Sequence, residues 1–86
     1  MALIILIIED EDLAARRLIR LIKELEDEVE VLEVLDSVKS SVAWLQENSH
    51  KVDLIFQDFH LADGNSFSIF EEVQIDVPII FSTAYD

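Results

Sequence analysis

The sequence predicts an α/β domain in which a parallel β-sheet lies between two layers of helices. Four apolar runs of strand length alternate with three segments of helical periodicity, in the order βαβαβαβ. The single glycine lies between predicted elements and the single proline at the beginning of the last strand. With 86 residues, 51% of them hydrophobic, the chain suffices for one compact domain, residues 1–86.

The first half of the chain predicts two strands separated by an amphipathic helix. Ala2 to Ile8 is a continuous run of branched apolar residues, which is typical of a central parallel strand buried on both faces. Glu30 to Leu35 alternates charged and apolar residues and predicts a strand nearer an edge. The helix between them is predicted to bury a stripe of apolar residues: Ala14, Leu18, Leu21, Ile22 and Leu25.

The second half predicts two further helices and two further strands. Asp36-Ser37 is expected to cap a helix over about Val38 to Asn48, and Val52 to Gln57 forms the third strand. Ser66 is expected to cap a short helix, and Val77 to Ser82 forms the fourth strand. Pro78 fits near the beginning of that strand, where its missing N–H is tolerated.

The composition excludes several classes of function. A net charge of −13 repels phosphate backbones, so direct binding of nucleic acid is not expected. The run Met1 to Ile8 is too short to span a bilayer and leads directly into acids, so no membrane association is expected. The absence of cysteine excludes disulfides and thiolate metal sites and fits a cytoplasmic location.

Polar residues follow three of the predicted strands at the point where each strand ends. Glu9 and Asp10 follow the first strand, Asp58 ends the third, and Thr83 ends the fourth. Because the carboxyl ends of parallel strands meet at one edge of a sheet, these side chains are predicted to converge in a crevice. Taken singly, the acids also fit helix capping or a turn, and the threonine fits an ordinary strand position.

Several strings around these residues resemble the receiver domain of a two-component response regulator, which has a CheY-like, flavodoxin-like fold. The resemblance extends over nearly the whole chain and is greatest to the LytTR-type branch. The strings that carry it are Ile8-Glu9-Asp10-Glu11, Leu13-Ala14-Ala15-Arg16-Arg17, Phe59-His60-Leu61-Ala62-Asp63-Gly64, Pro78-Ile79-Ile80-Phe81 and Ser82-Thr83-Ala84-Tyr85.

The resemblance implies a phospho-acceptor rather than an enzyme, with at most slow self-dephosphorylation. Asp58 is the expected acceptor of a phosphoryl group from a sensor histidine kinase, and Thr83 is the expected switch residue. Mg²⁺ is the expected cofactor, because a hard divalent ion relieves the repulsion among clustered carboxylates. Its implied ligands are Asp58, Asp10, Glu9 through water, and the backbone carbonyl of His60.

The sequence departs from a complete receiver at its carboxyl-terminal end. The family continues through a fourth helix, a fifth strand bearing a lysine, and a fifth helix, which do not occur before Asp86. The expected fold is therefore an incomplete receiver whose fourth strand is an apolar edge. Such an edge predicts a homodimer or segment-swapped oligomer that buries Ile79, Ile80, Phe81 and part of the Ala14-Leu18-Leu21 face.

Two other kinds of function compete with a phospho-acceptor. A truncated or engineered receiver fragment that has no activity and self-associates through its fourth strand remains an alternative. A phosphatase of the haloacid dehalogenase type and a Toprim nuclease both require a second aspartate two residues after Asp58, where His60 stands. The sequence therefore disfavours both of these enzymes.

Overall fold

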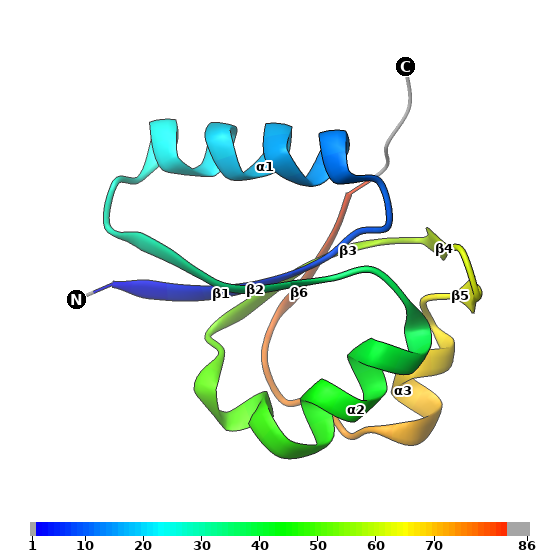
Figure 1. The fold of residues 1–86 in the computed structure, drawn as a ribbon. Helices are drawn as coiled ribbons and strands as arrows, with labels where there is room; N and C mark the ends of the chain where they lie inside the picture. Colours follow the sequence, from blue (N-terminus) through cyan, green and yellow to red (C-terminus); the bar gives the residue numbers. More distant parts are fainter. Residues whose placement is uncertain (1, 83–86) are drawn as a thin grey trace.

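The computed structural model describes residues 2–82 and confirms the predicted α/β fold (Figure 1). Four parallel strands form a sheet in the order β2-β1-β3-β6, and a separate antiparallel pair, β4-β5, follows β3. The strands of the sheet are β1 (Leu3–Ile8), β2 (Val29–Leu35), β3 (Leu54–Asp58) and β6 (Ile79–Ser82). The remaining elements are α1 (Asp12–Leu25), α2 (Val38–Asn48), the 3₁₀ turn η1 (Ser49–Lys51), β4 (His60–Leu61), β5 (Gly64–Asn65) and α3 (Ser68–Glu72).

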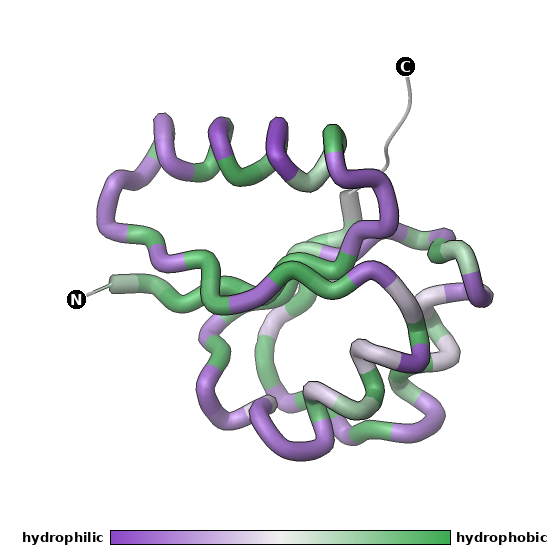
Figure 2. The backbone as a smooth tube through the Cα atoms, in the orientation of Figure 1, coloured by the Kyte–Doolittle hydropathy of each residue, from purple (hydrophilic) through white to green (hydrophobic). Residues whose placement is uncertain are grey.

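The two faces of the sheet carry separate hydrophobic cores. Successive residues of a strand point to opposite faces, so Ile5 and Ile7 of β1 pack beneath α1, whereas Leu6 and Ile8 pack against the layer of α2 and α3. Figure 1 shows α1 on one side of the sheet and both other helices on the opposite side. In Figure 2 the central strands are accordingly hydrophobic along most of their length. The continuous apolar run of β1 reflects this burial on both faces.

The buried stripe of α1 differs from the predicted one. Ala15 and Ile22 are buried, and Leu18 is partly buried against the same core. Leu21 and Leu25, which were expected to be buried, are 57% and 87% exposed. At about 100° per residue, Leu21 lies roughly a quarter turn away from the direction that faces the sheet, and Leu25 is the last residue of the helix. The apolar spacing alone therefore predicted the helix, but it did not predict which apolar residues of the helix are buried against the sheet.

The two helices on the other face begin in different ways. The hydroxyl of Ser37 accepts a hydrogen bond from the Ser40 amide at 3.0 Å, so Ser37 is the member of the predicted Asp36-Ser37 pair that caps α2. The prediction that Ser66 caps α3 is wrong, because the helix follows Phe67 and its cap residue makes no side-chain hydrogen bond. The Ser66 side chain is instead fully buried.

The outer strands of the sheet are β2 and β6. The position of β2 confirms the edge location predicted from its alternating charges. In the described part of the chain, β6 pairs only with β3, and its Ile80 side chain is 46% exposed. β6 begins at Ile79, directly after Pro78, and β3 begins at Leu54 rather than Val52. No helix within residues 2–82 has the length and apolar character needed to cross a membrane.

Candidate functional site

Three acidic side chains meet at the carboxyl-terminal edge of the central strands. Glu9 and Asp10 directly follow β1, and Asp58 is the last residue of β3, the strand that pairs with β1. Oxygen atoms of the three carboxylates all lie within 4.8 Å of one another. Parallel pairing of β1 and β3 brings together residues that are almost fifty positions apart in the sequence. The structure thus places three of the expected metal ligands in one cluster.

Glu9 is the buried member of this acidic cluster, with 5% of its surface exposed. Loss of hydration raises the pKa of its carboxyl group from 4.5 to about 7, and the neighbouring charges of Asp58 and Asp10 contribute to the rise. A hydrogen bond from the Glu11 amide to Glu9 Oε2, at 3.1 Å, works in the opposite direction. Near neutral pH, Glu9 is therefore divided between its protonated and ionised forms.

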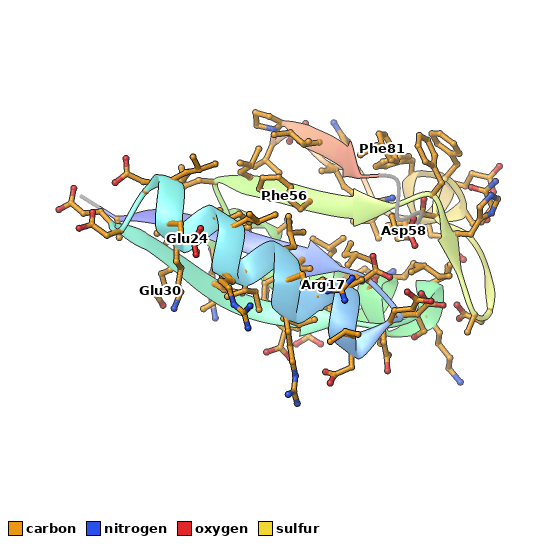
Figure 3. The ribbon with its side chains drawn as sticks, turned by 90° about the horizontal axis from the view of Figure 1, so that it is seen from above. Arg17, Glu24, Glu30, Phe56, Asp58 and Phe81 are labelled. Atoms are coloured by element: carbon orange, nitrogen blue, oxygen red, sulfur yellow. The ribbon has the colours of Figure 1, made fainter. Side chains whose placement is uncertain are left out.

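Asp58 is half-buried and has one carboxylate oxygen held in place. Its Oδ1 accepts a hydrogen bond of 2.8 Å from the amide of Phe59. Among the described residues, no hydrogen bond involves Oδ2, so this oxygen remains available to a ligand. Figure 3 shows Asp58 at the end of β3, on the edge where the chain leaves the sheet.

The structure does not test the roles predicted for two other site residues, Thr83 and His60. Thr83, the expected switch residue, lies outside the described residues, but the preceding Ser82 pairs with Asp58 in the register of β6 and β3. His60 has an exposed side chain and begins β4, where it pairs with Asn65. The role of its backbone carbonyl as a metal ligand stays a prediction.

The loop after Asp58 is a short hairpin that the sequence did not predict. β4 and β5 pair through His60 with Asn65 and Leu61 with Gly64. Gly64 has a φ of +150°, a conformation that favours glycine. The turn places Asp63 beside the beginning of α2, where its Oδ1 and Oδ2 accept hydrogen bonds from the amides of Val38 and Lys39, at 2.7 and 3.1 Å. The side chain of Asp63 therefore caps a helix that is remote in sequence, a contact that the local sequence pattern did not predict.

Substitution of Asp63 by asparagine is expected to destabilise the protein. The hydrogen bonds from the amides of Val38 and Lys39 lower the pKa of Asp63 below 3.8, so its stabilising effect is present above that value and is lost as the pH falls through the lowered pKa. An asparagine side chain at this position would keep at most one acceptor oxygen and no charge. Urea unfolding at pH 7 should therefore give a lower midpoint for Asp63→Asn, and the difference should shrink in strong acid.

The matched control for this prediction is Asp76→Asn, the same change at an exposed acid without a capping role. An Asp63→Asn midpoint equal to that of the control at pH 7 would contradict the capping role.

Four phenylalanine rings pack together beside the acidic cluster. Phe59 stacks on Phe81 of β6 with ring centres 4.7 Å apart, and the ring centre of Phe67 lies 5.2 Å from that of Phe81. Phe70 of α3 completes the group through an edge contact with Phe81. This group of phenylalanine rings joins β6 to the loop after Asp58 and to α3. The sequence showed these aromatic residues but not that they meet.

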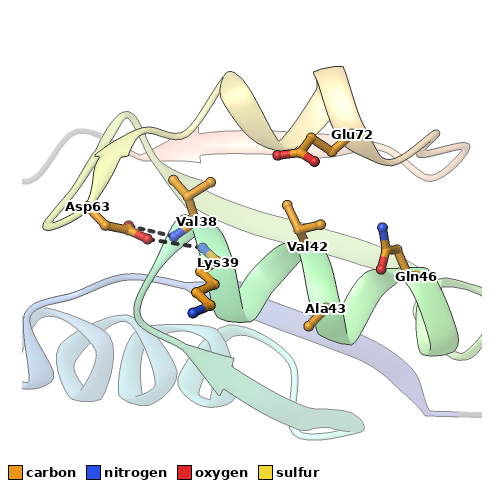
Figure 4. Close-up of a pocket in the computed structure, with 7 residues that line it drawn as sticks. All are labelled: Val38, Lys39, Val42, Ala43, Gln46, Asp63 and Glu72. Atoms are coloured by element: carbon orange, nitrogen blue, oxygen red, sulfur yellow. Dashed lines mark hydrogen bonds between the residues drawn. The ribbon is translucent and has the colours of Figure 1, made fainter.

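A groove of about 370 Å³ lies along α2, between that helix, the Asp63 turn and the end of α3 (Figure 4). Its wall is formed by α2, the Asp63 turn and Glu72 at the end of α3. None of the three clustered acids lines this groove. The lining residues are Val38, Lys39, Val42, Ala43, Gln46, Asp63 and Glu72.

Comparison with known proteins identifies the family. No protein-family model matches the sequence. The chain is 37% identical over 85 residues to the sensory transduction protein LytT of Bacillus subtilis, an alignment that covers 95% of this chain and 34% of LytT. The chain therefore spans about a third of the length of this curated relative.

Solved structures lead to the same family. The solution structure of the receiver domain of the PhyR response regulator from Erythrobacter litoralis superposes with a TM-score of 0.77 at 31% identity, covering 98% of this chain and 64% of that one. The crystal structure of PhyR from Brucella abortus gives 0.79 at 27% identity, covering 99% and 35%. With the sheet order and the likeness to LytT, these matches show that the chain belongs to the response regulator receiver domains.

Proposed function

We propose that this chain is a cytoplasmic receiver module that accepts a phosphoryl group on Asp58 from a sensor histidine kinase, with Mg²⁺ as cofactor. The observation that carries the proposal is the meeting of three carboxylates at the end of β1 and β3, with one oxygen of Asp58 held and the other available. Membership of the receiver family supports a role in two-component signalling.

The proposed reaction is a displacement at phosphorus. Oδ2 of Asp58 attacks the phosphoryl group, a P–O bond forms, and the P–N bond to the donor histidine breaks. The electron pair of the broken bond remains on the imidazole, which takes up a proton, and Asp58 becomes an acyl phosphate. The Phe59 amide fixes the carboxylate through Oδ1, so the plane of the nucleophile is set before the donor arrives.

The acidic cluster fits a hard divalent cation. Its donor set consists of carboxylate oxygens without nitrogen or sulfur, the set that Mg²⁺ prefers over softer metals. The raised pKa of Glu9 includes a contribution from repulsion within the cluster, which a cation would relieve. Glu9, Asp10 and Asp58 would hold the ion. When bound, Mg²⁺ would neutralise charge on the phosphoryl oxygens.

The proposal is tested by intact mass spectrometry after incubation with acetyl phosphate. We expect a gain of one phosphoryl group in the presence of Mg²⁺ and none with EDTA. The added group should be labile to hydroxylamine, as an acyl phosphate is. Circular dichroism under both conditions verifies that the protein is folded. A folded protein that gains no phosphoryl group with Mg²⁺ would contradict the proposal and favour a receiver fold without phospho-acceptor activity.

We also propose that the chain self-associates through β6, as a homodimer or a segment-swapped oligomer. Ile80 is 46% exposed on the outer strand, which carries free backbone hydrogen-bonding groups along its unpaired side within the described residues. Both features favour pairing with a second strand.

Ile80→Lys is expected to convert the oligomer to a monomer, because a charge on an edge strand opposes strand pairing. Size-exclusion chromatography with light scattering over a wide range of concentrations measures the change. Leu25→Lys, which places the same residue at an exposed position of α1, is the matched control and should leave the oligomer intact. A wild-type chain that remains monomeric at all concentrations would contradict self-association.

A further inference from the structure

The amide that holds the carboxylate of Asp58 belongs to Phe59, the first residue after β3. This amide donates the 2.8 Å hydrogen bond to Asp58 Oδ1. Phe59 lies between β3 and the short hairpin β4-β5, whose turn is exposed to solvent. Because exposed loops are more mobile than the elements they connect, the direction of the Phe59 amide depends on what holds this residue in place. The contacts of Phe59 therefore bear on the orientation of the proposed nucleophile.

The backbone of Phe59 is held at its carbonyl oxygen. This oxygen accepts a hydrogen bond of 2.9 Å from the amide of Ser66. Ser66 is fully buried, and its own carbonyl accepts a hydrogen bond of 3.2 Å from Nε2 of Gln57 in β3. A hydrogen bond at the carbonyl alone leaves Phe59 able to pivot about that bond. A contact through the side chain is needed to fix the tetrahedral Cα atom and, with it, the amide nitrogen.

The ring of Phe59 makes this side-chain contact. It stacks on the ring of Phe81, with ring centres 4.7 Å apart and an angle of 8° between the two planes. Phe67 packs against both rings, and its ring centre lies 5.8 Å from that of Phe59 and 5.2 Å from that of Phe81. Aromatic pairs at such separations stabilise a contact beyond the effect of the area they bury. The orientation of Phe59 is therefore fixed at its ring as well as at its carbonyl.

Phe81 belongs to a part of the fold that is held on two sides. In the register of β6 and β3, Phe81 pairs with Gln57 and the next residue pairs with Asp58. The ring of Phe70 in α3 meets the ring of Phe81 edge to face, with ring centres 6.4 Å apart and an interplanar angle of 83°. The sheet and a helix thus hold the ring on which the loop residue stacks.

We propose that Phe81 is a positioning residue for Asp58 and acts through the ring of Phe59 on the amide that holds Oδ1. This inference rests on the proposed role of Asp58 as phospho-acceptor. With the two rings stacked, Oδ1 is fixed before the phosphoryl donor arrives, and Oδ2 is presented for attack. Without the stack, the carboxylate adopts further orientations, and fewer of them are productive.

Phe81→Leu tests this role, because leucine keeps an apolar side chain in β6 and removes the ring that stacks on Phe59. The rate constant of phosphorylation is measured at saturating Mg²⁺ and a fixed concentration of acetyl phosphate. We expect it to fall about fivefold, a factor that corresponds to the strength of one aromatic pair. A rate constant equal to that of the wild type would overturn the proposal without affecting the proposed function.

Phe70→Leu is the matched control. It makes the same change in the same group of phenylalanine rings, where Phe70 contacts Phe67 and Phe81, and it leaves the stack of Phe59 on Phe81 in place. Urea unfolding should show that both variants lose stability, whereas the control should keep the wild-type rate constant. An equal fall of the rate constant in both variants would show that Phe81 serves only packing and would overturn the proposal.

Hydrogen exchange of the amide at position 59, followed by NMR in metal-free buffer, gives a readout independent of phosphorylation. In Phe81→Leu this amide should exchange faster than in the wild type and in Phe70→Leu, because its hydrogen bond to Asp58 forms less of the time. Unchanged exchange would overturn the proposal. A wild-type chain that gains no phosphoryl group contradicts the proposed function, and the exchange rate then decides the positioning role by itself.

Phe59→Leu removes the same stack from the loop side and keeps the backbone amide, so it replaces Phe81→Leu if that variant does not fold. It should lower the rate constant and speed the exchange in the same way. The double variant Phe59→Leu/Phe81→Leu should react no more slowly than Phe59→Leu, because loss of either ring removes the stack. Additive losses in the double variant would overturn a shared action of the two rings.

Discussion

Asp58→Asn is expected to abolish phosphorylation of the chain by acetyl phosphate. The carboxamide oxygen is a much weaker nucleophile than a carboxylate and yields no acyl phosphate. The asparagine side chain can still accept the 2.8 Å hydrogen bond that the Phe59 amide donates to Asp58, so the loop after β3 should keep its conformation. Intact mass after incubation with acetyl phosphate and Mg²⁺ should therefore show only the unmodified variant, with a native circular dichroism spectrum.

Asp27→Asn provides the matched control for this result. Asp27 is an exposed acid in the turn between α1 and β2, so the variant carries the same chemical change away from the cluster. It should be phosphorylated like the wild type. A phosphoryl group on the Asp58→Asn variant would place the acceptor on another carboxylate, with Glu9 and Asp10 the first to map by peptide mass spectrometry.

Asp58→Asn should also weaken the binding of Mg²⁺. The change removes one of three carboxylates whose oxygens lie within 4.8 Å of one another. We expect the dissociation constant to rise about tenfold or more, since each 1.4 kcal/mol of lost interaction corresponds to a factor of about ten. Isothermal titration calorimetry measures this change without any phosphoryl donor. An unchanged affinity would mean that Asp58 is not a ligand.

Glu9→Gln is expected to stabilise the metal-free protein at alkaline pH. The pKa of Glu9 is about 7 in the folded protein and near 4.5 when the chain is unfolded, so the carboxyl binds its proton more tightly in the folded state. Its contribution to stability is complete below pH 4.5 and is lost as the pH rises through about 7. Glutamine carries no titrating charge, and at pH 8 the variant should be more stable by roughly 2 kcal/mol, a figure reduced for screening by solvent.

Urea unfolding at pH 5.5 and pH 8, with and without Mg²⁺, measures this effect. The metal-free wild type should be less stable at pH 8 than at pH 5.5. The stability of the Glu9→Gln variant should decrease much less between these two pH values. Added Mg²⁺ should stabilise the wild type more at pH 8 than at pH 5.5, because the ion competes with the proton on Glu9. The variant should gain less from Mg²⁺ at pH 8.

Glu47→Gln, the same substitution at an exposed position of α2, should reproduce the wild-type dependence on pH and on Mg²⁺. If Glu9→Gln and Glu47→Gln behave alike in metal-free buffer, burial of an ionisable Glu9 does not limit the stability of the apo protein.

Local sequence patterns were sufficient for the four strands of the parallel sheet, for the three helices and for the acids at the strand ends, but not for the β4-β5 hairpin. The uninterrupted apolar run of β1 requires burial on both faces, and the alternating charges of β2 require an edge. Because parallel strands align their carboxyl ends, the pattern alone was enough to expect Glu9, Asp10 and Asp58 at one edge of the sheet. The role predicted for Thr83 stays a prediction, since that residue lies outside the described part of the chain.

Contacts between segments remote in sequence could not be inferred in this way. The capping of α2 by Asp63 spans 25 positions, and the exposure of Leu21 depends on how α1 is rotated over the sheet. The buried pair of Gln57 and Ser66 arises because β3 and the segment leading into α3 meet beneath the hairpin. Hydrophobic periodicity specifies which face of an element is apolar, and it carries no information on what that face or its polar neighbours contact.

The sequence by itself therefore determined the order of the four parallel strands and the three helices, the residues at the strand ends and the family likeness. Only the tertiary structure decided the raised pKa of Glu9 and which oxygen of Asp58 accepts the amide of Phe59. Loss of hydration, neighbouring charge and hydrogen bonding act over a few ångströms in space, between groups that lie far apart along the chain. These interactions exist only after the sheet has brought its strand ends together.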